Sequence, residues 1–376
     1  MGLFMTPKKV LLVSSLNAIS PANYLIAAFQ DLGIDVISVS DVSNINAQIK
    51  VRGKFDVGKY LVNSDVTPDL ILFVEGGDMG IFPVNYQHLG VPSFWWGIDT
   101  HNDYRKHLRI SRLFDHSFIA QKSFVEKLKI DGIRSVSWLP LAYPKQKNQE
   151  ASRDLDIAYV GSTDWSKYPE RGLLLKAISD AHNRIFVGQA TPKRMFEIYE
   201  KSKVVFNYSP MNDLNMRFFE AIGSGAVLIT NPIVDNGVED LFEKNTDFLE
   251  YSSLEDLTST LEKLLIEHDT IRNISSNGLR KVLEKHTYHH RAEAILSHSW
   301  NVHQDKEIRY FDTSAALLSM GMISGAMTYF FLSVKKETLG KRNRLILIVI
   351  TPFFALLSWG IRVIENSLNL IRNRRW

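Results

Sequence analysis

Three residues near the start of one apolar helix have side chains that could bind a phosphorylated ligand. They lie in the stretch 215–232, NMRFFEAIGSGAVLITNP. Asn215 is a residue type that caps helices, so we predict that the helix begins there, with Arg217 in its first turn and Glu220 one turn later on nearly the same face. Free N–H groups and the helix dipole attract anions such as a diphosphate at such a point. Arg217 adds positive charge, and the Glu220 carboxylate can accept two hydrogen bonds from a ribose diol.

Each of these assignments has a structural alternative. Glu220 is otherwise a carboxylate that caps the helix, and Arg217 is otherwise part of an ordinary surface ion pair. The glycines at 223 and 225 are expected to end the short helix and return the chain to a strand. The stretch therefore favours a nucleotide-diphosphate site without excluding a purely structural role.

Titratable side chains also follow two apolar runs in the first third of the chain. Asp99 and His101 lie in GIDTH, and Glu75 and Asp78 lie in FVEGGD. Both pairs come where a strand is expected to end, which is where ligands bind in open α/β sheets. Asp99 and His101 are candidates for acid–base chemistry, with loop capping as the alternative. Glu75 and Asp78 are candidates for ligand contact, although turn chemistry around their two glycines is the preferred explanation.

Composition excludes several function classes. The 376 residues include no cysteine, so disulfides, thiolate metal sites and a cysteine nucleophile are absent. No Walker A motif and no G-x-G-x-x-G after a strand occur, so kinase and NAD-dependent chemistry lack their fingerprints. His286, His289 and His290 have no carboxylates at suitable spacing and are followed by Arg291, so no metal ion is expected.

The alternation of short apolar runs with helical patterns predicts the fold. Near-continuous apolar strands alternating with helices indicate parallel sheets covered on both faces. Between two of the runs, Pro21 and Gly33 mark the start and end of a helix. The expected strands are 10–15, 35–40, 69–75, 92–99, 116–121, 135–142, 155–162, 184–188, 203–209, 226–231 and 247–252. We therefore predict an α/β chain with two Rossmann-like domains facing across a cleft.

A polar interruption, PKQKNQEASRD, separates the two series of strands and is interpreted as a linker. It places an N-terminal Rossmann-like domain at 1–147. A second Rossmann-like domain follows at 152–300, and a hydrophobic helical region at 307–376.

The C-terminal region predicts membrane association. Thr313–Val334 is 22 residues without a charge, and Leu345–Ile361 is 17. From Lys335 onward there are nine Lys or Arg residues against two Glu, and such charge beside apolar segments is typical of membrane surfaces rather than of nucleic-acid binding. Two spanning helices would place the basic loop between them outside, against the positive-inside rule, whereas a hairpin lying in the membrane plane would keep the basic residues on the cytoplasmic side, with the two α/β domains. The alternative is a pair of buried core helices.

A family resemblance follows from several blocks together. The run NMRFFEAIGSGAVLIT, preceded by VVFNYSPMND, resembles the donor-binding segment of GT-B glycosyltransferases. WWGIDTH, FDHSFIAQK, WLPLA and YHHRAEAIL are similar to further blocks of the group-1 branch, and most similar to its spore-maturation CgeB-like members. The resemblance covers about residues 8 to 300 and leaves the C-terminal region unaccounted for.

The resemblance implies roles for individual residues. Glu220 matches the glutamate that holds the donor's ribose, and the remaining donor-side positions are Arg217, Asn215, Gly161, Ser162, Arg171 and, less surely, Lys167. Arg171 and Lys167 fall where a basic residue meets the diphosphate, although Arg171 is otherwise simply the start of an exposed helix. One position departs from the pattern, because many related retaining enzymes carry a glutamate where this chain has Asn212, with Asp213 beside it. That departure leaves the sugar and the stereochemical outcome open.

The resulting expectation is a membrane-associated, metal-independent glycosyltransferase. Its donor is a nucleotide-diphosphate sugar, it needs no further cofactor, and its acceptor is a glycan or a lipid-linked molecule. Asp99 or His101 would be the catalytic base, with Glu75 and Asp78 on the acceptor side. The alternatives are a nucleotide-sugar epimerase of the same fold and a catalytically silent membrane scaffold. Homo-oligomerisation is possible, and no nucleic-acid partner is expected.

Overall fold

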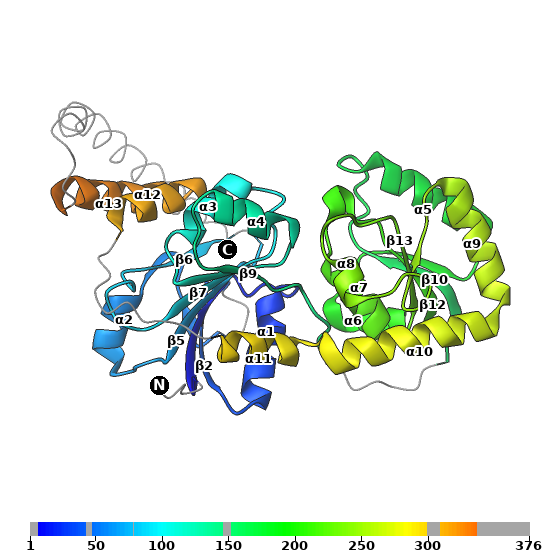
Figure 1. The fold of residues 1–376 in the computed structure, drawn as a ribbon, viewed down its shortest axis with the longest axis horizontal. Coiled ribbons are helices and arrows are strands. Elements are labelled where there is room, and N and C mark those ends of the chain that lie inside the picture. The colour runs from blue at the N-terminus through cyan, green and yellow to red at the C-terminus, as the bar shows by residue number, and fades with distance from the viewer. Residues whose placement is uncertain (1–6, 43–46, 78, 146–151, 299–308, 337–376) are drawn as a thin grey trace, which may run out of the picture.

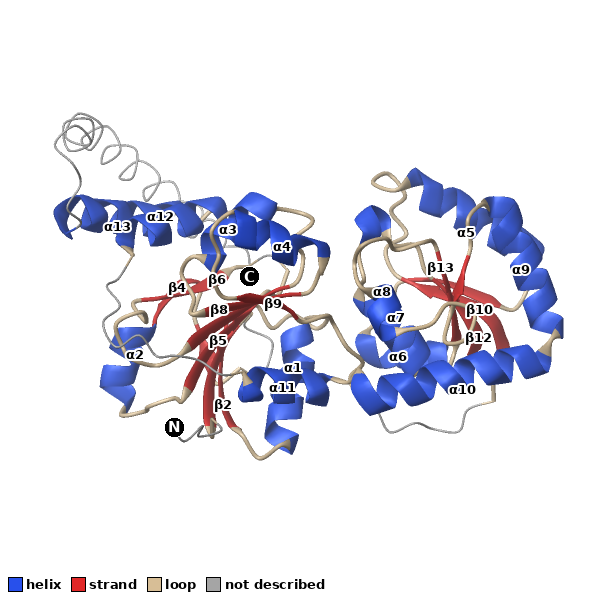
Figure 2. Ribbon diagram, viewed as in Figure 1, coloured by secondary structure: helices blue, strands red, loops and turns tan. Residues whose placement is uncertain are grey.

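The computed structural model describes residues 7–42, 47–77, 79–145, 152–298 and 309–336, with side chains up to Ser333. In this part of the chain two parallel sheets form the centres of two α/β domains, which lie side by side (Figures 1 and 2). Each of the eleven strands expected from the sequence is present in the structure.

The first domain contains a seven-stranded parallel sheet. Its elements are β1 (Lys9–Val13), α1 (Pro21–Asp31), β2 (Asp35–Ser40), β3 (Ile49–Lys50), β4 (Gly53–Asp56), α2 (Val57–Ser64), β5 (Leu70–Val74), β6 (Ile81–Val84), β7 (Ser93–Gly97), α3 (Tyr104–Ser111), β8 (His116–Ile119), α4 (Ser123–Ile130) and β9 (Val136–Trp138). The strand order is β3-β2-β1-β5-β7-β8-β9, and β4 pairs separately with β6. Helix α1 begins at Pro21 and is followed by Gly33 with φ 77°, as predicted.

Alternate residues of the central strands pack on opposite faces of this sheet. On one face, Val10 and Leu12 belong to a core shared with α1. On the other, Leu11 and Val13 pack with residues of α3 and α4. Burial on both faces explains why these strands are apolar without alternation.

The second domain contains a five-stranded parallel sheet. Its elements are β10 (Leu155–Val160), α5 (Pro169–Ala181), β11 (Ile185–Gly188), α6 (Pro192–Glu200), β12 (Ser202–Phe206), a 3₁₀ turn (Pro210–Asn212), α7 (Met216–Gly223), β13 (Val227–Thr230), α8 (Val238–Leu241), β14 (Leu249–Glu250), α9 (Leu254–Ile266) and α10 (His268–Lys285). The strand order is β11-β10-β12-β13-β14. Helix α7 begins after Asn215 and ends at Gly223, as predicted.

The chain then crosses back to the first domain. Helix α10 runs along the lower side of the second domain, and α11 (Tyr288–Ser297) lies against α1 (Figure 1). Arg291 fixes this crossing, because its Nε and Nη2 donate to the carbonyl oxygens of Pro140 and Leu141 at 2.7 and 3.1 Å. The last described helix of the second series therefore packs with the first domain.

The C-terminal region differs from the sequence prediction. Thr313–Val334 was expected to form one apolar segment long enough to cross a bilayer, and the structure instead has α12 (Tyr310–Ser319) and α13 (Ile323–Lys336). The chain turns between them at Gly321, where φ is 72°. Among the described residues, none of the helices combines the length and apolarity needed to span a membrane. The second expected segment, Leu345–Ile361, lies outside the described residues.

Helices α12 and α13 pack against each other and onto the first domain. Ser314 Oγ donates to the Ala326 carbonyl oxygen at 2.7 Å, and Leu317 and Ala326 join the core that contains β4 and β6. Tyr329 Oη donates to Asn85 Oδ1 at 2.6 Å. Some apolar residues of this segment therefore pack against the first domain.

Candidate functional site

The loop after β7, which carries Asp99 and His101, is held from below by Glu75. The Glu75 carboxylate accepts hydrogen bonds from the backbone N–H groups of Ile98 at 2.6 Å and Asp99 at 2.8 Å. Only 2% of Glu75 is exposed. Burial raises the pKa of Glu75, but the charge and hydrogen bond of His107 together with these backbone donors outweigh it and lower the pKa overall. Glu75 therefore lies beneath the loop as a charged support rather than on its surface.

Two further side chains fix the same loop. His107, on α3, has Nε2 3.2 Å from Glu75 Oε1 and Nδ1 3.0 Å from Thr100 Oγ1. Gln121, two residues after the end of β8, accepts from the Thr100 N–H at 3.2 Å and donates to the Ile98 carbonyl oxygen. The geometry of residues 98–101 is thus set by side chains from three neighbouring elements.

Across the domain boundary, this loop meets Asp213, which precedes α7. Gln121 Nε2 donates to Asp213 Oδ1 at 3.0 Å, and His101 Nδ1 lies 3.8 Å from the same oxygen. The exposed fractions of the His101 and Asp213 side chains are 8% and 14%. The carboxyl ends of both sheets therefore bring a histidine and carboxylates together at one point.

Two carboxyl groups of this cluster, those of Asp99 and Asp213, resist ionisation. Burial, followed by the charges of Glu75 and Asp213, raises the pKa of Asp99 to about 6, although His101 and His107 oppose the shift. Burial also raises the pKa of Asp213. An acid with a pKa near neutrality can exchange protons at working pH, which suits a general base.

The start of α7 has the predicted cap. Asn215 Oδ1 accepts from the Phe218 N–H at 3.3 Å, and Asn215 Nδ2 donates to Ser209 Oγ at 3.0 Å. The carboxyl ends of β12 and β13 surround this cap with polar groups, since Asn207 Nδ2 donates to both Ser209 Oγ and Thr230 Oγ1 at 3.0 Å. The helix start is therefore firmly positioned at the edge of the second sheet.

Arg217 is held inside the second domain. Its Nε and Nη2 donate to the Val160 carbonyl oxygen at 3.2 and 2.9 Å, and its Nη1 donates to Asn207 Oδ1 at 2.8 Å. The guanidinium carbon lies 4.6 Å from the centre of the Tyr159 ring. A Cβ atom at Gly161 would lie 2.6 Å from Arg217 Nη2, so the turn after β10 and this guanidinium fit closely together.

The other donor-side candidates lie around the same turn. Arg171 is only 8% exposed, and its guanidinium is within 6 Å of the rings of Tyr159, Trp165 and Tyr168. Its buried Nε has no hydrogen-bond partner among the described residues. Ser162 and Lys167 are exposed. The structure thus brings Gly161, Arg171 and Arg217 around Tyr159 and leaves Lys167 at the surface.

Glu220 is more buried than its expected role implies. It is 6% exposed, and its charge raises the pKa values of Tyr24, Tyr143, Tyr199 and Tyr288, all of which are themselves raised mainly or partly by burial. Burial raises the pKa of Glu220 to about 7, and Arg217 opposes the shift. No described residue donates a hydrogen bond to its carboxylate, and its oxygens are not among the fully buried polar atoms that lack a partner, so Glu220 is a largely buried acceptor whose oxygens are not completely enclosed.

Three residues of the site were not assigned by sequence reasoning. His107 belongs to no motif, Gln121 lies in the block FDHSFIAQK but was given no role, and Asp213 was noted only beside Asn212. A polar residue at the end of an expected strand is a signal that could have pointed to Gln121. Asp78, an acceptor-side candidate, lies outside the described residues.

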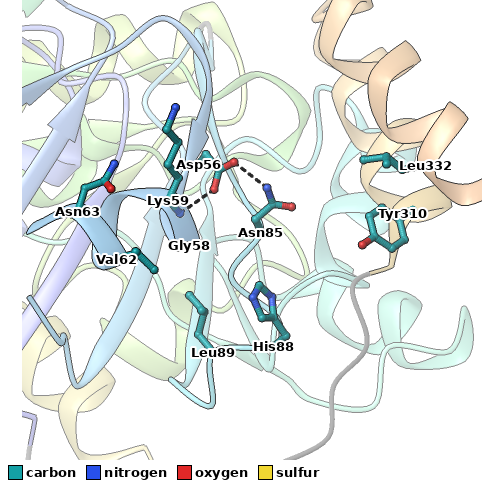
Figure 3. A pocket seen from close by; sticks show the side chains of 10 residues that line it. All are labelled: Asp56, Gly58, Lys59, Val62, Asn63, Asn85, His88, Leu89, Tyr310 and Leu332. Carbon is teal, nitrogen blue, oxygen red and sulfur yellow. Dashed lines mark hydrogen bonds between the residues drawn. The ribbon is translucent and has the colours of Figure 1, made fainter. Parts of the chain in front are cut away.

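A groove of about 540 Å³ lies elsewhere on the first domain (Figure 3). It is formed by α2, the loop after β6 and the C-terminal helices, with Lys59, His88, Tyr310 and Leu332 among its lining residues. Asp56 at its edge accepts from Asn85 Nδ2 at 2.7 Å and from the Lys59 N–H at 3.0 Å (Figure 3). None of the candidate site residues lines this groove, so it is distinct from the domain boundary.

Comparison with known proteins relates the second domain to one family of enzymes. Residues 145–297 match a family model described as glycosyl transferase-like. This range contains every donor-side candidate from Gly161 to Glu220. The predicted enzyme class agrees with this family. A search of curated proteins gives no match.

Solved structures share the fold of the whole two-domain unit. Anabaena HepE in complex with UDP-glucose is 11% identical, with 77% of this chain and 99% of HepE covered and a TM-score of 0.55. A glycosyltransferase from Rickettsia africae is 12% identical, with 78% and 100% covered and a TM-score of 0.53. At these identities the likeness concerns the fold, and it confirms the predicted architecture of two Rossmann-like domains with parallel sheets.

Proposed function

We propose that the chain is a glycosyltransferase that takes its sugar from a nucleotide diphosphate bound between α7 and the loop after β7. The observation that carries this proposal is Glu220, a largely buried carboxylate to which no described residue donates a hydrogen bond. A ribose diol supplies two O–H donors, which is what this acceptor lacks. HepE, whose fold is similar, was solved with UDP-glucose.

In this proposal the second domain holds the donor. The diphosphate lies against the N-terminus of α7 and the Gly161 turn, where helix N–H groups and the cations Arg217 and Arg171 stabilise the charge that grows on the leaving group. Losing one such group commonly slows the reaction by about 10²–10³-fold. Both cations also hold the fold around Tyr159, so their substitution is expected to affect stability as well.

The first domain provides the base. Asp99 and His101 face the second domain at Asp213, and either can remove the proton of an acceptor hydroxyl. Asn212, at the position where many retaining relatives carry a glutamate, leaves the stereochemistry open.

We further propose that the enzyme acts at a membrane, with its catalytic domains facing the cytoplasm, on a lipid-linked or glycan acceptor. Leu318 and Ile323 on the C-terminal helices are 60% and 37% exposed. Helix α12 contacts α3, which carries exposed Arg105 and Arg109. Apolar side chains next to basic ones suit a surface of anionic lipid.

The test is a panel of nucleotide sugars added to the detergent-solubilised full chain. A donor at 100 times its Kd is expected to raise the free energy of unfolding by about 2.7 kcal/mol. The same donor should be hydrolysed or transferred, and this activity should disappear in Glu220→Ala. Release of an isomerised nucleotide sugar without transfer would contradict the proposal, and so would a panel without stabilisation.

A further inference from the structure

Asp213 belongs to the second domain, but its side chain contacts residues of the first domain. Both of its side-chain partners in the described residues, Gln121 and His101, lie across the domain boundary. It follows directly on Asn212, whose φ is 57° and whose carbonyl oxygen accepts from Asn236 Nδ2 at 2.5 Å. A left-handed backbone outside glycine persists only where neighbouring contacts enforce it. The loop therefore holds Asp213 toward the other domain at some cost in strain.

His101 faces this carboxylate with a ring nitrogen that makes no hydrogen bond in the described residues. Its Nδ1 is buried and has no hydrogen-bond partner among the described residues. The distance of 3.8 Å to Asp213 Oδ1 is too long for a hydrogen bond, and an approach of about 1 Å would form one. Catalytic hydrogen bonds are often long before the ligand binds and shorten in the complex.

Building on the glycosyl transfer proposed above, we propose that Asp213 is the positioning carboxylate of His101. When the domains close, Asp213 Oδ1 accepts a hydrogen bond from Nδ1–H, and this selects the tautomer whose Nε2 is unprotonated. Gln121 sets the position of Asp213, because it donates to that carboxylate and to the Ile98 carbonyl oxygen in the loop that carries His101. The base is thus complete only when both domains contribute to it.

The proton then has a defined route. His101 Nε2 takes the proton of the acceptor hydroxyl while the acceptor oxygen forms its bond to the anomeric carbon. The bond from that carbon to the diphosphate oxygen breaks, and the diphosphate leaves with the electron pair. Asp213 stabilises the imidazolium without itself taking the proton, and Asp99, the other carboxylate facing His101, adds to this stabilisation.

The first test determines the tautomer of the His101 ring directly and requires no enzymatic turnover. Two-bond ¹H–¹⁵N correlation spectra of the full chain with UDP report the tautomer of each neutral histidine, and His101 is assigned from the signal that is lost in His101→Gln. The wild type is expected to show the Nδ1–H tautomer. Asp213→Asn should shift His101 toward the Nε2–H form, while Asp240→Asn, which removes the exposed Lys122–Asp240 contact across the same boundary, should not. The proposal is overturned if His101 of the wild type carries its proton on Nε2, or if Asp213→Asn does not change the tautomer of His101.

The second test measures the hydrolysis of UDP-glucose. Asp213→Asn is expected to lower kcat by about 10²-fold with KM changed less than twofold, and Asp240→Asn to leave both unchanged. The double variant with His101→Ala should be no slower than His101→Ala alone, because residues that act as one unit are not additive. Multiplicative losses would show that Asp213 acts independently of His101. If the wild type hydrolyses no nucleotide sugar, the proposed function fails, whereas the tautomer test still decides the role of Asp213.

Discussion

His107 Nε2 lies 3.2 Å from Glu75 Oε1, and both side chains are buried beneath the loop that carries Asp99 and His101. Glu75 also accepts two backbone hydrogen bonds from this loop. Glu75, which supports the loop of the candidate base, is therefore buried and charged. Its removal leaves His107 and two backbone N–H groups without their acceptor.

Glu75→Ala is expected to lower the free energy of unfolding by about 3–5 kcal/mol, because it leaves His107 and two N–H groups without their acceptor. The folded-state pKa of Glu75 is lowered, so its stabilisation is present above its unfolded pKa and is lost as the pH falls through the folded value. The difference in the free energy of unfolding between the variant and the wild type should thus become smaller below about pH 4.3. Denaturation series in urea at several pH values measure it. Glu126→Ala, which removes the exposed pair with Lys129, should cost less than about 1 kcal/mol.

Glu220→Gln should stabilise the unliganded protein at neutral pH. The pKa of Glu220 is raised to about 7 by burial, so the folded state binds a proton that the unfolded state releases, and wild-type stability falls as the pH rises from about 4.5 to 7. Above pH 7 the variant should be more stable by up to about 3 kcal/mol, and below pH 4.5 the two should be equal. Equal stability across the whole range would show that Glu220 is already paired.

The same variant should bind UDP about tenfold more weakly, because a charge-assisted hydrogen bond to the ribose is lost. Calorimetric titration with UDP and with its 2′,3′-dideoxy analogue separates ribose recognition from a general loss of structure. The analogue, without the two hydroxyls, should bind wild type and variant within a factor of two. An equal loss for both ligands would count against the ribose assignment.

Gly161→Ala should disturb the donor side of the second domain. A Cβ at this position would lie 2.6 Å from Arg217 Nη2 and 2.7 Å from Tyr159 Oη, so Arg217 must give up its hydrogen bonds to Val160. We expect a loss of about 1–3 kcal/mol in stability and weaker binding of UDP. Gly188→Ala, at the end of the neighbouring strand, is the matched control, because its nearest contact would be at an ordinary 3.5 Å.

Leu318→Asp should weaken binding of the full chain to vesicles that contain anionic lipid, as measured by co-sedimentation. Leu318 is 60% exposed on α12, so the change should leave folding intact. Ile266→Asp, at a 77% exposed position at the end of α9, should leave vesicle binding unchanged. If both variants bind like the wild type, α12 does not contact the membrane.

Sequence patterns predicted the sheets well, because strands buried on both faces are apolar throughout. They missed β3, β4 and β6, which are only two to four residues long, and Pro83 within β6 argued against a strand. They also missed the turn at Gly321, because an uncharged helix pair packed onto a domain and a membrane segment have the same composition. Only tertiary structure distinguishes them.

The geometry of the candidate site was predictable where it depends on local structure. The cap at Asn215 and the end of α7 follow from residue types within one helix. Glu220 instead interacts electrostatically with tyrosines from four separate segments, and the contact of His101 with Asp213 joins residues 112 positions apart. Such contacts arise from the packing of two domains, which no local pattern describes.

Hydrogen–deuterium exchange of the full chain with and without UDP-glucose tests the location of the site most directly. We predict that residues 215–220 and residues 98–101 become protected together, since the ligand would lie between the two domains. Protection confined to the groove beside α2, or no protection in either segment, would contradict the assignment.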